Sequence, residues 1–324
     1  MPHAIRIHAY GGPEVMLWEQ VPSVAPKRGE ALVRQTAVGL NFIDIYERTG
    51  LYGGSLPTGL GREAAGIVEA IGPGVRDVKV GDRVAYASAL AGAYTDERVL
   101  PVTQLVPVPD GVSDRLAAAA LLKGMTAQVL LRRTYKVRKG TVVVVHSAAG
   151  GVGSILVQWA LHLGAHVIAV VGSDAKAATV RAMGRKDVLI QGREDLPARI
   201  KELSGGQGAH VVYDAVGKDT FFASLDALRP LGLMVTYGNA SGPVPPVAPL
   251  ELAKRGSLFL TRPTLFAYTA KRSDLLKSAA ELFDVIGRGV VRIEIGQTYP
   301  MRDVQRAHRD LGERRTIGST VLLP

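Results

Sequence analysis

The sequence predicts an α/β protein of two domains, one β-rich and one built on a doubly wound parallel sheet. At 324 residues the chain is longer than a single hydrophobic core usually organises. Residues 1–122 carry strand patterns between Gly, Pro and Asp punctuation. Residues 123–262 alternate apolar runs such as "TVVVVH" and "HVIAVVG" with helical patterns, which is typical of parallel strands buried on both faces.

The two ends of the chain are expected to form one domain. Strand-like segments of residues 1–122 include "EALVRQTAVGL", "AAGIVEAIGPGV" and "GDRVAYAS". Residues 263–324 contain one clear helix, for which Ser273 is the expected N-cap and Gly287 or Gly289 the expected end. A strand-like segment, a short helix and a terminal strand follow it. Because this tail resembles the first section, we expect it to pack back against residues 1–122.

Composition and charge exclude several classes of function. The chain has no cysteine, which excludes disulfides, thiolate metal sites and cysteine nucleophiles. No segment has the length and apolar character of a signal peptide or a membrane span, so a cytoplasmic protein is expected. The net charge of +10 raises the question of nucleic acid, but the basic residues are scattered or in short pairs without interleaved aromatics. We therefore predict a basic surface with one or two anion contacts, and keep nucleic acid as the minor alternative.

A glycine-rich turn links the first strand of the second domain to a helix. The strand ends at His146, and the helix that follows has apolar residues at helical spacing, among them Ile155 and Trp159. Backbone N–H groups at a helix N-terminus favour an anion, and glycines permit its close approach, so a dinucleotide pyrophosphate is the expected occupant. The spacing reads small-x-x-G-x-x-G from Ser147 rather than the usual G-x-G-x-x-G, and a tight turn that binds nothing is the alternative. The predicted pyrophosphate contacts are Gly150, Gly151, Val152 and Gly153.

The end of the next strand favours NADPH over NADH. Gly172 and Ser173 come directly after the strand, and Lys176 follows. A hydroxyl and a lysine suit a 2′-phosphate, which a carboxylate in the same pocket would repel. Two alternatives stay open here. Asp174 lies at the distance from the glycine turn expected of a residue that binds the NAD ribose, and Lys176 could be a solvated residue of the first helical turn.

Several segments together resemble one family. They are "GLNFIDIYERTGLY", "GLGREAAGIVEAIGPGV", "VGDRVAY", "LLKGMTA", "AAGGVG", "VVYDAVG", "TRPTL" and "TIGSTVLLP". In this order they resemble the zinc-independent, zeta-crystallin-like quinone oxidoreductases of the medium-chain dehydrogenase/reductase superfamily. The resemblance covers essentially the whole chain. It implies a GroES-like catalytic domain (1–122, joined by 263–324) and a Rossmann NADP-binding domain (123–262).

The chain departs from the zinc enzymes of that superfamily at the metal site. Those enzymes hold the metal with cysteine and with the histidine of a Gly-His-Glu segment, whereas this chain reads Gly61-Arg62-Glu63, and a guanidinium is no zinc ligand. The pair His162 and His166 is expected to cap a helix or face solvent. No metal is expected. Without one, either hydrogen bonds must stabilise the substrate's carbonyl oxygen or the acceptor must be readily reduced. Quinones fit, because hydride transfer leaves a phenolate whose conjugate acid has a pKa of about 10.

The resemblance also implies site residues. Asn41, Tyr46 and Tyr52 match positions beside the nicotinamide and the substrate: Asn41 would bind the nicotinamide ribose or a quinone oxygen, and the tyrosines would stack on the ring or donate a hydrogen bond. Structural roles remain the alternative, with Asn41 only capping a helix. Asp44 is the weakest of these candidates. The further implied cofactor contacts are Thr126, Gly238, Asn239, Arg262 and Arg314.

One departure bears on cofactor choice, and alternatives to the implied activity remain. A tyrosine that the family often places near the 2′-phosphate is absent; Ile190 and Gln191 stand there, with Gln191 or Arg193 as possible substitutes. The implied reaction is metal-independent hydride transfer from nicotinamide C4 to a quinone in a cleft between the domains. An NADPH-dependent enone or alkenal double-bond reductase is the first alternative, and a non-catalytic nucleotide- or RNA-binding protein is the second. A homodimer paired through the sheet edge of the nucleotide domain is expected from the family.

Overall fold

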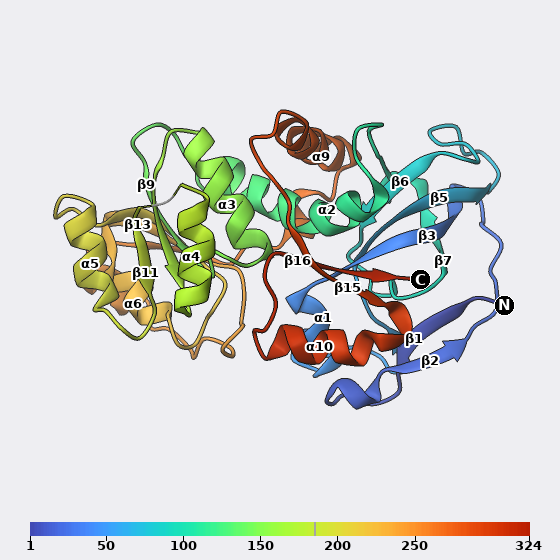
Figure 1. Ribbon diagram of the computed structural model, residues 1–324, viewed down its shortest axis with the longest axis horizontal. Helices are drawn as coiled ribbons and strands as arrows, with labels where there is room; N and C mark the ends of the chain where they lie inside the picture. Colours follow the sequence, from blue (N-terminus) through green and yellow to red (C-terminus); the bar gives the residue numbers. More distant parts are fainter. Residues whose placement is uncertain (185) are drawn as a thin grey trace. The chain divides into compact units, whose positions relative to one another are not determined.

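Figure 1 shows a computed structural model of the chain, which describes residues 1–184 and 186–324. The chain forms two compact units. The first comprises Met1–Met125, Thr269–Gly287 and Ile293–Pro324, and the second comprises Thr126–Tyr268 and Arg288–Arg292. Both strands and helices contribute to each unit. The α/β fold class predicted from the sequence is confirmed.

The unit boundaries differ at their margins from the division expected at 122/123 and 262/263. Residues 123–125 group with the first unit, and residues 263–268 and 288–292 with the second. The cause of the first difference is helix α2 (Asp114–Val129), which runs through the boundary without a break. The change of sequence pattern near Lys123 therefore does not coincide with the change of unit.

The second unit is built on a six-stranded sheet in which all neighbouring strands are parallel. The strand order is β11-β10-β9-β12-β13-β14. The strands are β9 (Val142–His146), β10 (His166–Val171), β11 (Val188–Ile190), β12 (Ala209–Asp214), β13 (Leu228–Thr236) and β14 (Phe259–Thr261). The chain builds one half of the sheet outward from β9 and then returns to build the other half from β12. The switch point of this doubly wound fold thus lies at the carboxyl end of β9.

Apolar strand residues and helices form the core of this unit. Val144, Ile168, Val212 and Met234 come from four different strands and are all buried in one cluster. The helices are α3 (Gly151–His162), α4 (Asp174–Ala182), α5 (Leu196–Leu203), α6 (Phe221–Asp226), α7 (Leu250–Lys254) and α8 (Leu265–Tyr268), with a π-helical turn at Leu130–Thr134. Strands β9, β10 and β12 are buried over nearly their whole length, which is why they appear in the sequence as continuous apolar runs.

The first unit contains two sheets. The smaller has the order β2-β1-β4, and the larger has the path β15-β16-β3-β5-β6-β8, with β7 also pairing with β3. The strands are β1 (His3–Ile7), β2 (Leu17–Gln20), β3 (Glu30–Leu40), β4 (Thr58–Gly59), β5 (Glu63–Ile71), β6 (Arg83–Ala87), β7 (Glu97–Pro101), β8 (Val106–Pro107), β15 (Ile295–Pro300) and β16 (Ser319–Leu323). The last strand of the chain joins the larger sheet, since β16 pairs antiparallel with β3.

Besides α2, the helices of this unit are α1 (Phe42–Arg48), α9 (Arg272–Gly287) and α10 (Val304–Gly312), with 3₁₀ turns at Pro13–Val15, Val102–Gln104 and Met301–Asp303. Ser273, the expected N-cap of α9, lies inside that helix, which begins one residue earlier. Within the described part of the chain, no helix combines the length and the apolar character needed to cross a membrane.

Candidate active site

The glycine turn sits at the carboxyl end of β9, at the switch point of the parallel sheet. Ser147 begins it with a φ of 52°, a left-handed conformation that usually calls for glycine. The Ser147 carbonyl oxygen accepts a hydrogen bond from Gly150 N (2.8 Å), and Gly150 is the N-cap of α3. A Cβ at Gly153 would overlap the same carbonyl oxygen. The turn is therefore shaped by backbone alone, beside the N–H groups that a helix start leaves without partners.

The residues that follow β10 form the N-cap of α4 and one partner of an ion pair. Ser173 is the N-cap, and its hydroxyl accepts a hydrogen bond from Lys176 N (3.4 Å). Asp174 is held by Arg193 through two bonds, Nη1 to Oδ1 (2.7 Å) and Nη2 to Oδ2 (2.5 Å). The pair is exposed, and the guanidinium offsets the charge of the Asp174 carboxylate. Gln191 is tied by its backbone N–H to Val171 O (2.9 Å) at the neighbouring strand end.

At the ends of β12 and β13, a loop is fixed by polar side chains. Asp214 accepts hydrogen bonds from Val216 N (2.7 Å) and Gly217 N (3.0 Å) and is fully buried. Arg262 donates from Nη1 to the Gly238 carbonyl oxygen (2.9 Å), and the amide oxygen of Asn239, oriented for bonding, accepts from Arg262 Nη2 (3.1 Å). The structure thus brings Gly238, Asn239 and Arg262 together, and Arg262 acts on the loop itself.

In the first unit, the start of α1 carries the other group of candidates. Asn41 is the N-cap of α1 and forms a capping box with Asp44, whose Oδ2 accepts from Asn41 N (2.9 Å). Asn41 therefore caps a helix, which is the structural role that the sequence left open for it. Tyr46 is buried and Tyr52 is 49% exposed, with their rings edge to face at 5.6 Å between centroids. Tyr46 thus supports Tyr52, which offers an aromatic surface.

Asp44 belongs to a buried chain of polar groups with a defined direction. Its Oδ2 accepts from the Tyr94 hydroxyl (2.7 Å), which also lies 3.0 Å from Nε2 of His308. Arg48 Nη1 lies 3.2 Å from Nδ1 of His308 and can only donate, so His308 carries its proton on Nε2 and donates to Tyr94. Burial, and next the charge of Glu47, raise the pKa of Asp44 to about 7.

A buried ion pair lies on the other side of Asn41. Glu63, at the start of β5, has no exposed surface, and its Oε1 accepts from Lys123 Nζ (2.8 Å) and Asn41 Nδ2 (2.8 Å). Its Oε2 accepts from Leu122 N (2.7 Å). The sequence patterns did not predict this role for Glu63 and Lys123. The available signal was a charged residue in each of two apolar segments, "EAAGIV" and "LLKGM".

Comparison with known proteins gives the family. Residues 27–110 match the alcohol dehydrogenase GroES-like domain, and residues 151–284 match the zinc-binding dehydrogenase family. The chain is 48% identical over 325 residues to a quinone oxidoreductase of Pseudomonas aeruginosa, with 100% of both chains covered. It belongs to the quinone oxidoreductase family of the medium-chain dehydrogenases/reductases. It is also 44% identical over 331 residues to a 2-haloacrylate reductase of Burkholderia sp, covering 100% of this chain and 99% of that protein.

A solved structure of the family agrees with this assignment. The Escherichia coli quinone oxidoreductase complexed with NADPH matches with a TM-score of 0.97 and 44% identity, covering 99% of this chain and 100% of that one. The recognition made from the sequence is therefore confirmed, together with the GroES-like and Rossmann-like character of the two parts.

Arg62, which stands where the zinc enzymes of the superfamily have a metal-binding histidine, makes other contacts in this chain. Arg62 donates from Nε to Glu47 Oε1 (2.6 Å) and from Nη1 to the Ser88 carbonyl oxygen (3.3 Å). His166 contacts Asp187, with 2.8 Å between Nε2 and Oδ2. Over residues 1–184 and 186–324, no group of three or more His, Cys, Asp or Glu side chains is arranged to hold a metal ion.

The remaining predicted cofactor contacts are distributed over both units. Thr126 lies on α2 and is half-buried in the second unit, to which the glycine turn and Gly172 also belong. Arg314 lies in the first unit, exposed in the loop between α10 and β16, with a φ of 61°. The structure therefore gathers the predicted pyrophosphate, adenosine-phosphate and loop residues at one edge of one sheet, and it places Asn41, Tyr46 and Tyr52 together in the other unit.

Proposed function

We propose that this protein is an NADPH-dependent quinone reductase that works without a metal. The observation that carries the proposal is the turn Ser147–Gly153 at the switch point, where Gly153 leaves no room for a Cβ and the start of α3 offers backbone N–H groups. These features fit a dinucleotide pyrophosphate. Bound NADPH would supply the hydride, and a quinone would accept this hydride and one proton to become a hydroquinone.

Each group of residues has a part in this proposal. Gly150, Gly151, Val152 and Gly153 bind the pyrophosphate through their backbone. Gly172, Ser173 and Lys176 surround the 2′-phosphate, and the Asp174–Arg193 pair supports this choice because the guanidinium offsets the carboxylate. Thr126, Gly238 and Asn239 contact the nicotinamide half, with Arg262 bracing their loop and Arg314 adding a cationic contact. Asn41, Tyr46 and Tyr52 face the nicotinamide and the quinone.

An assay with two acceptors and two cofactors tests the proposal. We expect the absorbance of NADPH to fall in the presence of 1,4-benzoquinone, with NADH a poorer donor. A chelator should leave the rate unchanged, since neither a cysteine nor a histidine stands at the metal segment Gly61–Glu63. Absence of quinone-dependent NADPH oxidation by the folded protein, or loss of activity with the chelator, would refute the assignment.

An enone or alkenal reductase is the second candidate, favoured by the 44% identity to a 2-haloacrylate reductase. Hydride delivery to a conjugated carbon needs a similar arrangement of cofactor and acceptor. Comparing kcat/KM for 1,4-benzoquinone, a simple enone and a 2-haloacrylate separates the two. A higher kcat/KM for either unsaturated carbonyl compound would replace the quinone as the preferred acceptor.

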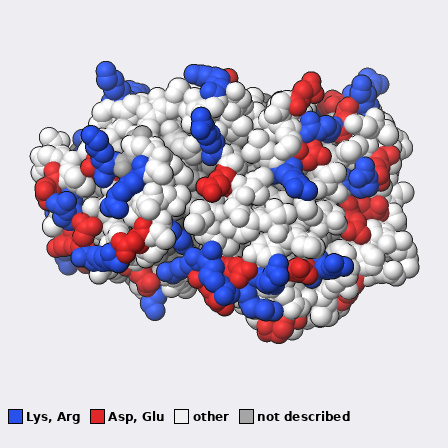
Figure 2. Space-filling view, in the orientation of Figure 1, with Lys and Arg blue, Asp and Glu red and all other residues white. Residues whose placement is uncertain are grey.

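A non-catalytic RNA-binding function has less support. On the face drawn in Figure 2, basic and acidic side chains are intermingled. A salt-sensitive RNA gel shift together with no NADPH oxidation would favour this alternative over the reductase.

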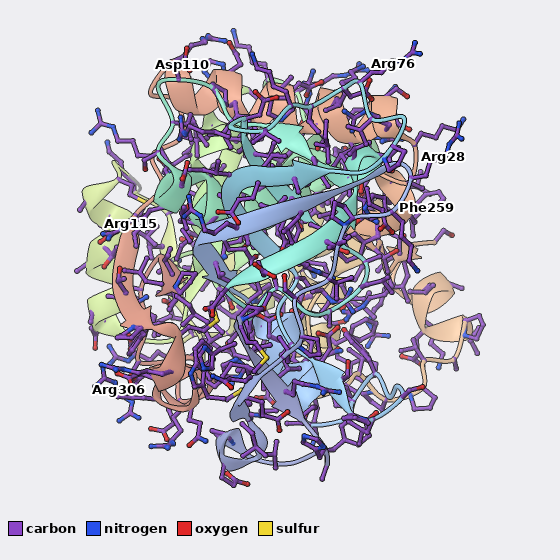
Figure 3. The ribbon with its side chains drawn as sticks, turned by 90° about the vertical axis from the view of Figure 1, so that its right-hand side faces the viewer. Arg28, Arg76, Asp110, Arg115, Phe259 and Arg306 are labelled. Carbon is purple, nitrogen blue, oxygen red and sulfur yellow. The ribbon has the colours of Figure 1, made fainter. Side chains whose placement is uncertain are left out.

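We also propose a homodimer in the cytoplasm, formed through strand β14. This strand lies at the end of the six-stranded sheet, and Phe259 (Figure 3) and Leu260 are 60% and 38% exposed. An exposed apolar edge strand is a ready pairing site for a second copy. Light scattering should give twice the chain mass for the wild type and the chain mass for Phe259→Lys. A monomeric wild type would contradict the dimer. Cell fractionation tests whether the protein is cytoplasmic.

A further inference from the structure

The buried ion pair of Glu63 and Lys123 has no part in the function proposed above. The exposed fractions of the two side chains are 0% and 7%. A buried ion pair does not usually stabilise a fold more than apolar side chains of the same volume, because removing two charges from water offsets their attraction. The position of this pair therefore needs an explanation other than stability.

Glu63 determines which way the Asn41 amide points. An ionised carboxylate can only accept hydrogen bonds, and Glu63 Oε1 accepts from Asn41 Nδ2 at 2.8 Å. The Asn41 amide nitrogen must therefore face Glu63, and its oxygen faces the start of α1, where it completes the capping box. An amide oxygen has two lone pairs, so this oxygen can accept both from the start of α1 and from a ligand hydroxyl. Asn41 is thus fixed as a hydrogen-bond acceptor.

Glu63 is itself fixed from two sides, both on α2. Leu122 N donates to its Oε2 (2.7 Å), and Lys123 Nζ donates to its Oε1 (2.8 Å). The lysine also supplies the counter-charge beside this carboxylate, whose side chain has no exposed surface. Asp44, on α1, is a further charged group at this site, and it accepts from the backbone N–H of Asn41 rather than from the amide.

We propose that Glu63 and Lys123 are positioning residues that hold Asn41 as an acceptor, so that Asn41 binds a hydroxyl group and does not donate to the quinone oxygen. This inference rests on the proposed reductase function and decides between the two roles that the sequence left open for Asn41. The hydroxyl could belong to the cofactor ribose or to the hydroquinone product. Both sources share the same chemistry, an O–H donor.

The decisive variant is the double substitution Glu63→Gln with Lys123→Met. The backbone N–H of Leu122 requires the new amide to place its oxygen at the Oε2 position, so that its NH₂ group faces Asn41. Asn41 must then turn its oxygen toward Gln and lose its acceptor on the ligand side. Because both charges are gone, the fold should recover the thermal stability that Lys123→Met alone removes.

We expect the unfolding temperature of the double variant to lie within a few degrees of that of the wild type. Its kcat/KM should nevertheless be lower by about tenfold or more, because one hydrogen bond to the ligand is lost. The matched control is Glu47→Gln with Arg62→Met. It removes the neighbouring pair, which is also largely buried at 10% and 15% side-chain exposure and does not bond to Asn41. The control should keep kcat/KM within about twofold. Recovery of activity together with stability in the double variant, or an equal loss in the control, would overturn the proposal.

Two further measurements identify the hydroxyl and separate this inference from the proposed function. Weaker NADPH binding by calorimetry without quinone assigns it to the ribose, whereas an effect confined to the quinone KM and kcat assigns it to the hydroquinone. If NADPH binding and the quinone KM and kcat all stay unchanged in the double variant, Asn41 does not bind a hydroxyl group. The amide orientation is read without any ligand, from the exchange of the Asn41 side-chain NH₂ protons by NMR. These should exchange slowly in the wild type and quickly in the double variant; equal rates would contradict the orientation even if the wild type lacked quinone reductase activity.

Discussion

Replacing Asp44 by asparagine should change how the stability of the protein depends on pH. Burial, the charge of Glu47 and, more weakly, the charge of Glu63 raise the pKa of Asp44 from 3.8 to about 7, against hydrogen bonds from Tyr94 and Asn41 that lower it. A folded-state pKa above the unfolded one means that the carboxyl stabilises the fold at low pH and that this contribution is lost as the pH rises through about 7. At about 1.4 kcal/mol per pKa unit, the full interval corresponds to about 4 kcal/mol.

Asparagine resembles the protonated carboxyl and cannot ionise. Its amide oxygen can accept from Tyr94 and from the backbone of Asn41, and its NH₂ group takes the place of Oδ1, a buried atom with no hydrogen-bond partner. That unpaired NH₂ group costs about 1 to 3 kcal/mol at every pH. Relative to the wild type, Asp44→Asn should therefore gain about 2.5 kcal/mol of unfolding free energy between pH 5 and pH 8.

The assay is urea denaturation of both proteins at pH 5, 6, 7 and 8. His308, whose pKa is lowered to about 3 by burial and by Arg48, destabilises the fold as the pH falls below the ordinary value of 6.5. It is present in both proteins, so the difference between them isolates Asp44. The reasoning is refuted if the difference in unfolding free energy is the same at pH 5 and pH 8.

Three further substitutions test the nucleotide unit. Gly153→Ala places a Cβ against the Ser147 carbonyl oxygen and should lower the unfolding free energy by about 1 to 3 kcal/mol and weaken NADPH binding; full stability by urea titration would contradict the tight turn. Ser147→Gly relieves a left-handed conformation, so stability should be unchanged or rise by up to about 1 kcal/mol, and a clear loss would show that the serine side chain is needed. Lys176→Ala should weaken NADPH binding by about 1.5 to 3 kcal/mol in calorimetry and leave NADH binding unchanged. Lys201→Ala, on α5, is the control. Equal losses of affinity for both cofactors would contradict a contact between Lys176 and the 2′-phosphate.

Local sequence patterns were sufficient for the strand-turn-helix unit and for the series of parallel strands. The runs "TVVVVH" and "HVIAVVG" became β9 and β10, because a strand buried on both faces must be apolar at every position. The glycine turn was also predictable, since only glycine avoids the overlap at position 153 and the next strand and helix fix where the turn lies. The unit boundary within α2 was not predictable from the sequence, because a continuous helix leaves no break in the sequence pattern.

The sequence by itself thus determined the fold class, the family and the place of the glycine turn, because each depends on residues that are close together along the chain. Only the tertiary structure decided the surroundings of Asn41, where Glu63 lies 22 residues further along the chain and Lys123 a further 60. It also decided that Arg193 pairs with Asp174 from 19 residues away. Hydrogen bonds and ion pairs act over a few ångströms regardless of sequence separation, so their partners are known only once the strands and helices are packed.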